Sequence, residues 1–237
     1  MIYIGTSGWF YRSWQPGFYP AELPTYKWLE FYAMHFNTVE INSTFYRVPS
    51  ASTVKGWIRK LPTDFHLTCK VNRTITHRKR LKNVREDLIG FLEVLSPIKQ
   101  RYGMLLFQLP PSIKLDMGEL EEFLSSLPGD FRYAVEFRNS RWFDDSVFEL
   151  LSRYNVAFVS VSAPGLPDDI VVTTDFLYVR FHGKDRWYDY LYSDEELSVW
   201  ASKIKKHTAV SDAYCYFNND VGGYAIRNAL LLQSLLS

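Results

Sequence analysis

The sequence contains only two cysteines, Cys69 and Cys215, which lie far apart within apolar runs. Two cysteines at this separation exclude a disulfide framework and a cysteine-rich zinc site, and reduced thiols in a protein core fit them best. No apolar stretch approaches the roughly 18 residues that a membrane helix needs. The N-terminus also lacks a basic region followed by an apolar segment, which is typical of a secretory signal. These absences predict a cytoplasmic protein with no membrane partner.

An excess of charge of one sign is also missing, since 27 Lys and Arg residues balance 26 Asp and Glu residues, for a formal net charge of +1. The chain therefore has no overall field that would attract nucleic acid, and any preference for anions must be local. The HExxH, CxxC, GxSxG and P-loop motifs are absent, as is any cofactor fingerprint. The sequence accordingly points to no metal, leaves the cofactor unknown and leaves the oligomeric state open.

What the sequence does contain is a regular alternation of strand-like and helix-like segments along its 237 residues. Strands are predicted at 2–7, 38–43, 65–71, 103–109, 132–137, 157–162, 176–182 and 212–217. Helices are predicted at 25–36, 50–61, 84–101, 116–127, 141–153, 193–206 and 222–236. Eight such units without a Pro/Gly/Ser-rich linker indicate parallel βαβ units closed into a barrel. We therefore predict an α/β fold, a (β/α)8 TIM-type barrel, with one domain over residues 1–237.

One connection departs from the alternation. Residues 163–175 contain Pro164, Gly165 and Pro167, which disfavour a helix. The sixth helix is therefore expected to be reduced or missing.

Within the strands, apolar and polar residues alternate with a period of two, which predicts the face that each residue occupies. Apart from Ser43, one phase of strands two to eight is apolar and is expected to face the helices, Val159 and Val161 included. The opposite phase, which includes Ser160 and Ser162, is expected to face the barrel interior. Its polar residues concentrate at the C-terminal halves of the strands, where barrel enzymes carry their sites.

If the barrel closes, one rim gathers a cluster of polar side chains. The ionisable members are Glu40, Lys70, Glu136, Arg138, Arg180 and His182, and the amides between them are Asn42, Gln108 and Asn218. Glu40, Glu136 and His182 are the candidates for proton transfer, and an unperturbed histidine pKa of about 6.5 suits that role. The alternative is a structural network of neutralised charges with His182 as a hydrogen-bonded wall residue. Because buried ion pairs give little net stability, we prefer a functional site.

Three cations at one mouth, Lys70, Arg138 and Arg180, favour a small anionic or phosphorylated ligand. The loops after the seventh and eighth strands often bind phosphate in this fold, and here a Gly222-Gly223 pair precedes the last predicted helix. Hydrolase or isomerase chemistry fits the residues better than redox chemistry. A Schiff base at Lys70 stays open and would require a lowered pKa.

Aromatic residues follow the first two strands, and Trp9 and Tyr46 are expected at the same rim. They would stack on a sugar or a base, or form a hydrophobic lid. The third loop adds the basic run 77–80. Binding or processing of nucleic acid by this aromatic rim and basic loop is therefore the alternative function.

Several short motifs follow the order of a known family. They are Gly5-Thr6-Ser7-Gly8-Trp9, VEINSTFY at 39–46, Lys70 with Thr76-His77, Gln108-Leu109-Pro110-Pro111, Glu136-Phe137-Arg138, Arg180-Phe181-His182-Gly183 and Tyr216-Phe217-Asn218-Asn219. In these residues the chain resembles the YecE-like family, also called domain of unknown function 72, over nearly its whole length. The resemblance implies a (β/α)8-type barrel and implies no particular reaction. One departure is Lys184, where the resemblance would place an arginine after His182-Gly183.

Overall fold

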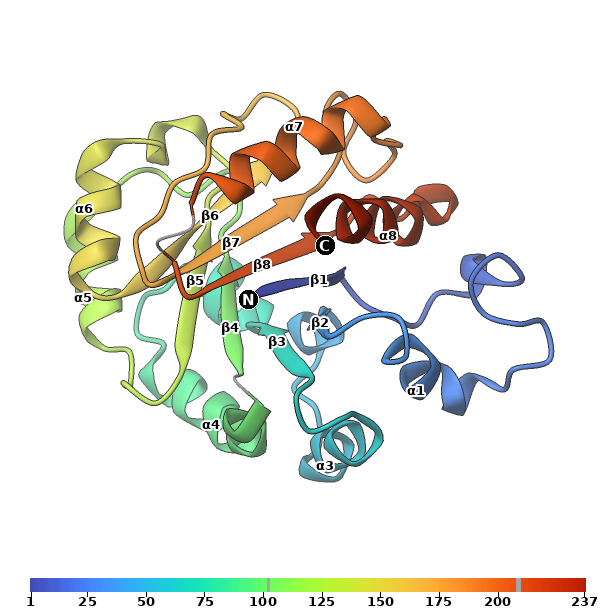
Figure 1. Cartoon of the computed structure of the whole chain (residues 1–237). Helices are drawn as coiled ribbons and strands as arrows, with labels where there is room; N and C mark the ends of the chain where they lie inside the picture. Colours follow the sequence, from blue (N-terminus) through green and yellow to red (C-terminus); the bar gives the residue numbers. More distant parts are fainter. Residues whose placement is uncertain (102, 208–209) are drawn as a thin grey trace.

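Eight parallel strands form a nearly closed barrel (Figure 1) in the computed structural model of the chain, which describes residues 1–101, 103–207 and 210–237, and only the backbone of residue 100. The strands are β1 (Ile2–Thr6), β2 (Thr38–Ile41), β3 (His66–Lys70), β4 (Met104–Gln108), β5 (Arg132–Glu136), β6 (Val156–Ser162), β7 (Phe176–Phe181) and β8 (Asp212–Phe217). Their order in the sheet is β1-β8-β7-β6-β5-β4-β3-β2. Each predicted strand coincides with one of them, and the ends differ by no more than two residues. The predicted (β/α)8-type barrel is confirmed.

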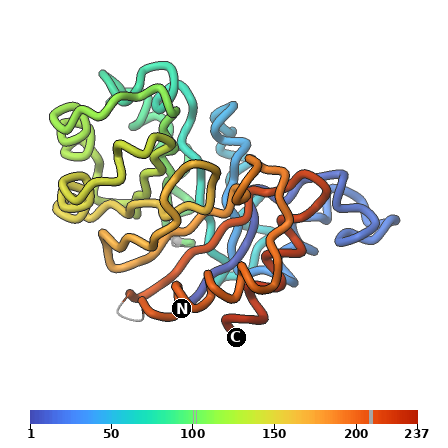
Figure 2. Tube along the Cα trace, turned by 90° about the horizontal axis from the view of Figure 1, so that it is seen from above, coloured from blue at the N-terminus to red at the C-terminus, as the bar shows by residue number. Residues whose placement is uncertain are grey.

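Helices surround the sheet, as the view from above shows (Figure 2). The α-helices are α1 (Trp28–Tyr32), α2 (Ser43–Tyr46), α3 (Ala51–Lys60), α4 (Arg85–Leu95), α5 (Met117–Ser125), α6 (Asp145–Arg153), α7 (Asp194–Lys205) and α8 (Tyr224–Leu236). Short 3-10 turns are η1 (Arg12–Trp14), η2 (Thr25–Lys27), η4 (Ser96–Arg101), η5 (Ser140–Trp142) and η6 (Val221–Gly223), and η3 (Thr74–Arg78) is a π-helical turn. As predicted, no helix lies between β6 and β7.

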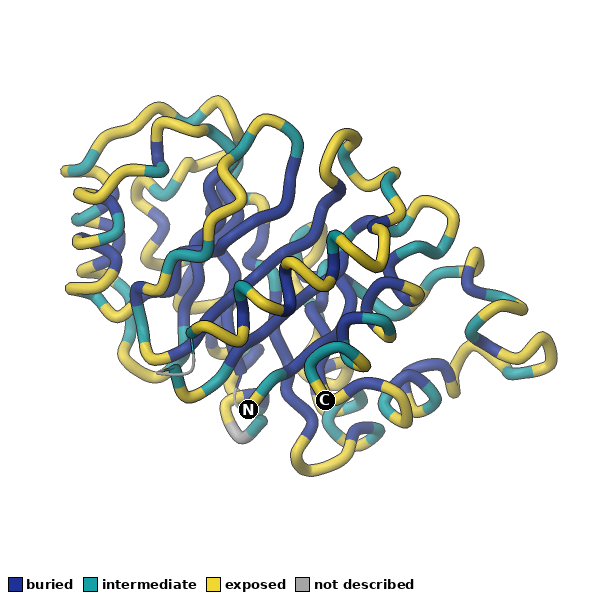
Figure 3. Tube along the Cα trace, turned by 45° about the horizontal axis from the view of Figure 1, so that its top comes forward, coloured by how far each residue is buried: buried dark blue, intermediate teal, exposed yellow. Residues whose placement is uncertain are grey.

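The core lies in two layers, one inside the barrel and one between the strands and the helices. The strands are buried along most of their length, whereas each helix has both buried and exposed residues along its length (Figure 3). Cys69 and Cys215 are buried free thiols in this core. Within the described ranges, none of the helices combines the length and the apolarity that a membrane span requires.

Three predicted helices are clearly shorter than their sequence patterns indicate. The helix predicted at 141–153 begins only at Asp145, after the 3-10 turn η5. The helix predicted at 84–101 ends at Leu95, because Pro97 lacks a backbone donor and its ring disfavours a further α-helical turn. The helix predicted at 25–36 is a 3-10 turn followed by the five-residue α1. The short helix α2 after β2 was not predicted.

In β6, the side chains that were predicted to face inward face outward, and those predicted to face outward face inward. Val159 and Val161 pack inside the barrel, whereas Ser160 and Ser162 face outward. The connection from β6 to β7 covers this strand in place of a helix, and the backbone N–H of Val171 donates to Ser160 Oγ at 2.9 Å. A strand covered by polar backbone needs hydrogen-bonding side chains on its outer face, which explains the wrong assignment.

The barrel closes least completely between β1 and β2. One isolated bridge, between Ser7 and Glu40, joins their ends. Tyr32 of α1 completes this seam, because its hydroxyl accepts from the Thr6 N–H at 2.9 Å and donates to the Thr38 carbonyl at 3.2 Å. The hydroxyl of one helix residue thus supplies hydrogen bonds that a neighbouring strand would otherwise provide.

Replacing Tyr32 with phenylalanine is expected to lower the free energy of unfolding by about 1–3 kcal/mol, since two buried backbone groups lose a partner. Urea unfolding at pH 7 measures the change. The matched control is Tyr26→Phe, at a side chain that is 65% exposed, where a change within about 0.5 kcal/mol is expected. Equal stability of the two variants would contradict the bridging role of Tyr32.

Candidate functional site

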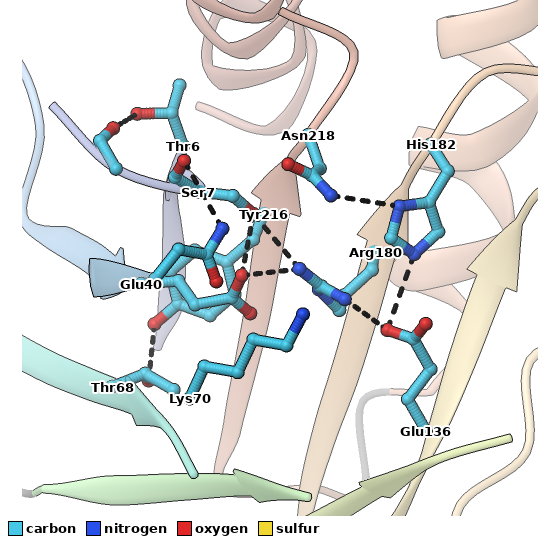
Figure 4. Close-up of polar contacts among 12 residues, drawn as sticks. Thr6, Ser7, Glu40, Thr68, Lys70, Glu136, Arg180, His182, Tyr216 and Asn218 are labelled. Atoms are coloured by element: carbon cyan, nitrogen blue, oxygen red, sulfur yellow. Dashed lines mark hydrogen bonds and ion pairs between the residues drawn. The ribbon is translucent and has the colours of Figure 1, made fainter. Parts of the chain in front are cut away.

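Arg180 lies at the centre of the charged cluster predicted from the sequence (Figure 4). It projects from β7 into the barrel and is completely buried. One terminal nitrogen donates to Glu40 Oε1 at 2.6 Å, and the other donates to Glu136 Oε2. Burial alone would lower the pKa of Arg180, yet Glu136 and Glu40 hold it above its usual value. The guanidinium therefore stays charged and joins β2, β5 and β7.

Both oxygens of Glu40 already have partners. Oε1 accepts from the Ser7 hydroxyl at 2.6 Å as well as from Arg180, and Oε2 accepts from the Tyr178 hydroxyl at 2.6 Å. Ser7 and Tyr178 were not predicted as site residues, since neither carries a charge. The available signal was the position of Tyr178, two residues before Arg180 on the same interior phase of β7.

Glu136 is likewise held between cations. Arg138 Nε donates to Oε1 at 2.5 Å, so these residues, two positions apart in the sequence, form an ion pair. Burial would raise the pKa of Glu136, but Arg138 and Arg180 hold it well below its usual value. The carboxylate is therefore ionised at neutral pH, with both oxygens engaged.

His182 is neutral in this arrangement. The side-chain nitrogen of Asn218 lies 3.2 Å from Nδ1, and Nε2 lies 3.3 Å from Glu136 Oε2. Nδ1 therefore accepts, and Nε2–H donates to the carboxylate. Burial lowers the pKa of His182 to about 3. In these surroundings His182 orients Glu136, and its role in proton transfer stays a prediction.

Lys70 differs from the other cations of the cluster. It ends β3, is half-buried, and places Nζ over the Phe45 ring at 4.3 Å from the centroid. Figure 4 shows it extending toward the centre of the cluster without a dashed contact. No carboxylate among the described residues lies within ion-pair distance of it. Burial and the charge of Arg180 lower the pKa of Lys70 to about 7, so the amine gains and loses a proton near neutral pH.

His77 lies in the same part of the mouth, on the π-helical turn η3. Its ring meets the Phe45 ring edge-on at 4.8 Å. Burial and the charge of Lys70 lower the pKa of His77 to about 4. The sequence assigned His77 to an exposed basic run. π-helical turns are rare and concentrate at functional sites, and no simple residue pattern predicts one.

A cleft of about 570 Å³ opens beside Arg138. Its other lining residues are Pro111, Asn139, Ser140, Pro164, Gly165, Leu166, Trp187 and Tyr188. The Arg138 guanidinium lies 4.7 Å from the centre of the Trp187 ring and donates to the Tyr188 hydroxyl at 2.5 Å. Gly183, with φ of 110°, permits the turn that brings these two aromatic residues back over His182. The predicted ligand contact Arg138 thus lines an open cleft.

The predicted amide residues lie around the cluster. Asn218 contacts His182, and Gln108 stands opposite Glu136 in the β4–β5 register with its amide donating to its neighbour's carbonyl. Asn42 Nδ2 lies 3.5 Å from the Ser7 carbonyl. Asn42 Oδ1 is buried without a hydrogen-bond partner among the described residues, as is Arg180 Nε. Both atoms could be satisfied by a ligand or by water.

The two predicted aromatic residues lie outside the charged cluster. Trp9 is half-buried and packs edge-on against Trp57 of α3, with ring centroids 6.1 Å apart. Tyr46 is 67% exposed and packs against Phe45. Phe45 links Tyr46 to the charged cluster, because its ring contacts both Tyr46 and the ammonium group of Lys70.

Asp220, on the loop after β8, is a titratable group that the sequence analysis did not single out. Its Oδ1 accepts from Trp14 Nε1 at 2.6 Å, and burial raises the pKa of Asp220 to about 6. A carboxylate at this position disfavours an anion near the glycine pair that follows it. Among the described residues, no three His, Cys, Asp or Glu side chains are grouped so that they could hold a metal ion.

Solved structures share this fold. The chain aligns with a DUF72 family protein from Thermotoga maritima at a TM-score of 0.90 and 34% identity, over 100% of this chain and 99% of that one. A DUF72 family protein from Enterococcus faecalis aligns at a TM-score of 0.88 and 22% identity, over 100% and 95% of the two chains. The second likeness supports the fold alone.

Curated relatives extend the comparison. UPF0759 protein YecE of Escherichia coli (strain K12) is 28% identical over 244 residues, which cover 92% of this chain and 86% of the relative. UPF0759 protein YunF of Bacillus subtilis (strain 168) is 27% identical over 270 residues, which cover 100% and 95%. The family model described as "Protein of unknown function DUF72" matches residues 3–237. Because that match spans nearly the whole barrel and agrees with the motifs around its mouth, the chain belongs to the DUF72 family.

Proposed function

We propose that this protein is an enzyme that acts on a small anionic substrate, phosphorylated ones included, at the carboxyl ends of its strands. Lys70 is the group that changes charge during the reaction, and Arg138 is the contact for the anion. The observation that carries the proposal is that Lys70 is a mouth cation without a carboxylate partner among the described residues, whereas both buried carboxylates are fully engaged.

The distribution of charges supports these roles. Glu40 and Glu136 are each compensated by arginine, so they act mainly by fixing Arg180 and Arg138 in place. A proton acceptor is most effective when its pKa lies near the working pH, and the pKa of Lys70 is about 7. Hydrolases and isomerases both use such a group. Proton transfer by Glu40 or Glu136 would instead require a ligand to displace an arginine first, and His182, with a pKa of about 3, is a weak proton acceptor.

A thermal-shift screen tests the proposal. The panel contains inorganic phosphate, sugar phosphates and small carboxylates, measured from pH 6 to pH 9. A ligand at a hundredfold excess over its dissociation constant is expected to stabilise the wild type by about 2.7 kcal/mol. Because the pKa of Lys70 is about 7, its charge is present below pH 7, and the shift should shrink as the pH rises above 7.

Two variants and one control complete this screen. Lys70→Met and Arg138→Gln should each lose most of the shift, whereas Lys184→Met, at an exposed lysine, should keep it. Anion binding that is unchanged in Lys70→Met would refute the role of Lys70.

Nucleic acid is the second candidate, and the same panel includes short oligonucleotides. Arg78, Lys79 and Arg80 of the third loop are exposed, although Lys79 pairs with Asp87 at 2.6 Å. A shift with oligonucleotides that falls steeply with salt, and that is lost when Arg78 and Arg80 are replaced by glutamine, would favour this alternative.

A further inference from the structure

We propose that Lys70 acts as a nucleophile, whose amine condenses with the carbonyl group of an anionic oxo compound to form an imine at the mouth of the barrel. The proposal rests on the function proposed above and deepens it, since it names the substrate class as small oxo acids or phosphorylated carbonyl compounds. The geometry that points to it is a half-buried lysine without a carboxylate partner among the described residues, which lies among cations, one of which, Arg138, lines an open cleft.

The first step of the argument is the electrostatic environment of Lys70. The charged groups that influence it are Glu40 from β2, Glu136 from β5, Arg138 just after β5, and Arg180 from β7. Both carboxylates are already bound to arginine, and although each raises the pKa of Lys70, burial and the charge of Arg180 outweigh them. Burial disfavours the charged form, and the cation–π contact with the Phe45 ring offsets only part of that cost.

The second step is nucleophilicity. An amine attacks a carbonyl carbon only when it is neutral, and a lysine in water is almost entirely protonated at pH 7. The pKa of Lys70, about 7, leaves roughly half of the amine neutral at that pH. A lysine needed only to attract an anion would be served better by its ordinary charge.

The bond changes balance without a further reactant. The neutral Nζ forms a bond to the carbonyl carbon, and the carbonyl oxygen takes up a proton to give a carbinolamine. The carbon–oxygen bond then breaks, and the oxygen leaves as water with a second proton, while the nitrogen has lost two. Solvent at the mouth carries these protons, and no atom is oxidised or reduced.

The third step concerns the rest of the substrate. Arg138 borders the cleft of about 570 Å³, and its charge is among those that act on Lys70. Its Nε is engaged by Glu136 and one terminal nitrogen by Tyr188, which fixes the guanidinium at the edge of the cleft. The proposal therefore assigns the anionic group of the substrate to Arg138 and its carbonyl group to Lys70.

Reductive trapping of the wild-type protein tests the proposal. The protein is incubated with glyoxylate and sodium cyanoborohydride at pH 7, and peptide mass spectrometry follows carboxymethyl-lysine at each position. Lys70 should be modified at least about tenfold faster than exposed Lys184, because far more of its amine is neutral. The rate at Lys70 should reach half its maximum near pH 7, and the rate at Lys184 should still rise above pH 9.

Variants separate the parts of the proposal. Lys70→Arg keeps a cation and should lose the adduct at residue 70, with Lys184→Arg as the matched control. Arg138→Gln should slow trapping of glyoxylate at Lys70 more than trapping of the uncharged aldehyde propanal, whose rate changes only through the pKa of Lys70. If glyoxylate and propanal are affected alike, the anionic substrate class is wrong.

The failure of this inference can be told from failure of the proposed function. If Lys70 is modified no faster than Lys184 while wild-type anion binding still depends on Lys70, the imine proposal is overturned and the proposed function stands. If anion binding is also independent of Lys70, both are overturned. The wild-type measurement needs no variant to fold, so it decides the question by itself.

Discussion

Replacing Arg180 with methionine is expected to lower the free energy of unfolding by about 3–5 kcal/mol. The substitution leaves Glu40 completely buried without its ion pair and removes one of the two arginines from Glu136. Removing one partner of a buried pair is costly because the remaining charge is then uncompensated, although the intact pair adds little net stability. For a chain of this length the thermal midpoint should fall on the order of 10 °C. Urea and thermal unfolding at pH 7 measure both quantities.

Arg153→Met is the control for Arg180. Arg153 also forms an arginine–glutamate pair, with Glu121 at 2.9 Å, but the two side chains are 64% and 45% exposed. Exposed pairs are worth at most about 1 kcal/mol, so this variant should be nearly as stable as the wild type. A loss below about 1 kcal/mol in both variants would mean that Arg180 does not hold the cluster together.

The wild-type protein is expected to lose stability steadily as the pH falls from 6.5 to 4, a range in which carboxylates usually contribute little. Burial lowers the pKa of His182 from 6.5 to about 3 and those of His66 and His77 from 6.5 to about 4. Below pH 6.5 the unfolded chain therefore takes up protons at these three residues, and the folded chain does not. Each histidine contributes a slope of about 1.4 kcal/mol per pH unit that opposes folding in acid, and Asp220, whose pKa is raised to about 6, offsets about one of them below pH 6.

Urea unfolding at pH 7, 6, 5 and 4.5 measures this slope. His182→Gln keeps a hydrogen-bonding side chain and should reduce the slope below pH 6 by about half, because one proton is removed from a net uptake of about two. Glu136 adds a separate loss at lower pH: its pKa is depressed, so its contribution is present above pH 4.5 and falls as the pH drops through its folded-state pKa. A free energy of unfolding that is flat between pH 6.5 and 4.5 would show that these histidines are protonated in the fold.

The positions of the strands and the meeting of Glu40, Glu136 and Arg180 could be predicted from the sequence. Alternation with a period of two places the three residues on the interior face, and closure of a parallel barrel brings the ends of their strands together. The wrong phase of β6 shows the limit of this reasoning, because Ser160 faces a loop where the other strands face a helix.

The pairing of charges could not be predicted, because it depends on how far side chains reach across the barrel. Lys70 lies on β3, beside the strand that carries Glu40, yet Arg180 reaches Glu40 from β7. Lys70 is therefore left without a carboxylate partner among the described residues, and burial and the charge of Arg180 lower its pKa. His77 and Tyr178 were missed for related reasons: a π-helical turn sets the position of the first, and a hydrogen bond across the barrel gives the second its role.

Because β1 pairs with β8 and hardly with β2, the strands pair in a particular order during synthesis. β1 has its backbone partners in β8, residue by residue from Ile2 with Ala213 to Thr6 with Phe217. A ribosome releases β2 to β7 before β8. The first strand can therefore pair with β8, the last strand, only after the strands between them have been made and can pair with each other. Glu40 likewise forms its ion pair with Arg180 only after β7 has been synthesised. The nascent protein therefore completes its charged cluster only when the barrel around it is almost complete.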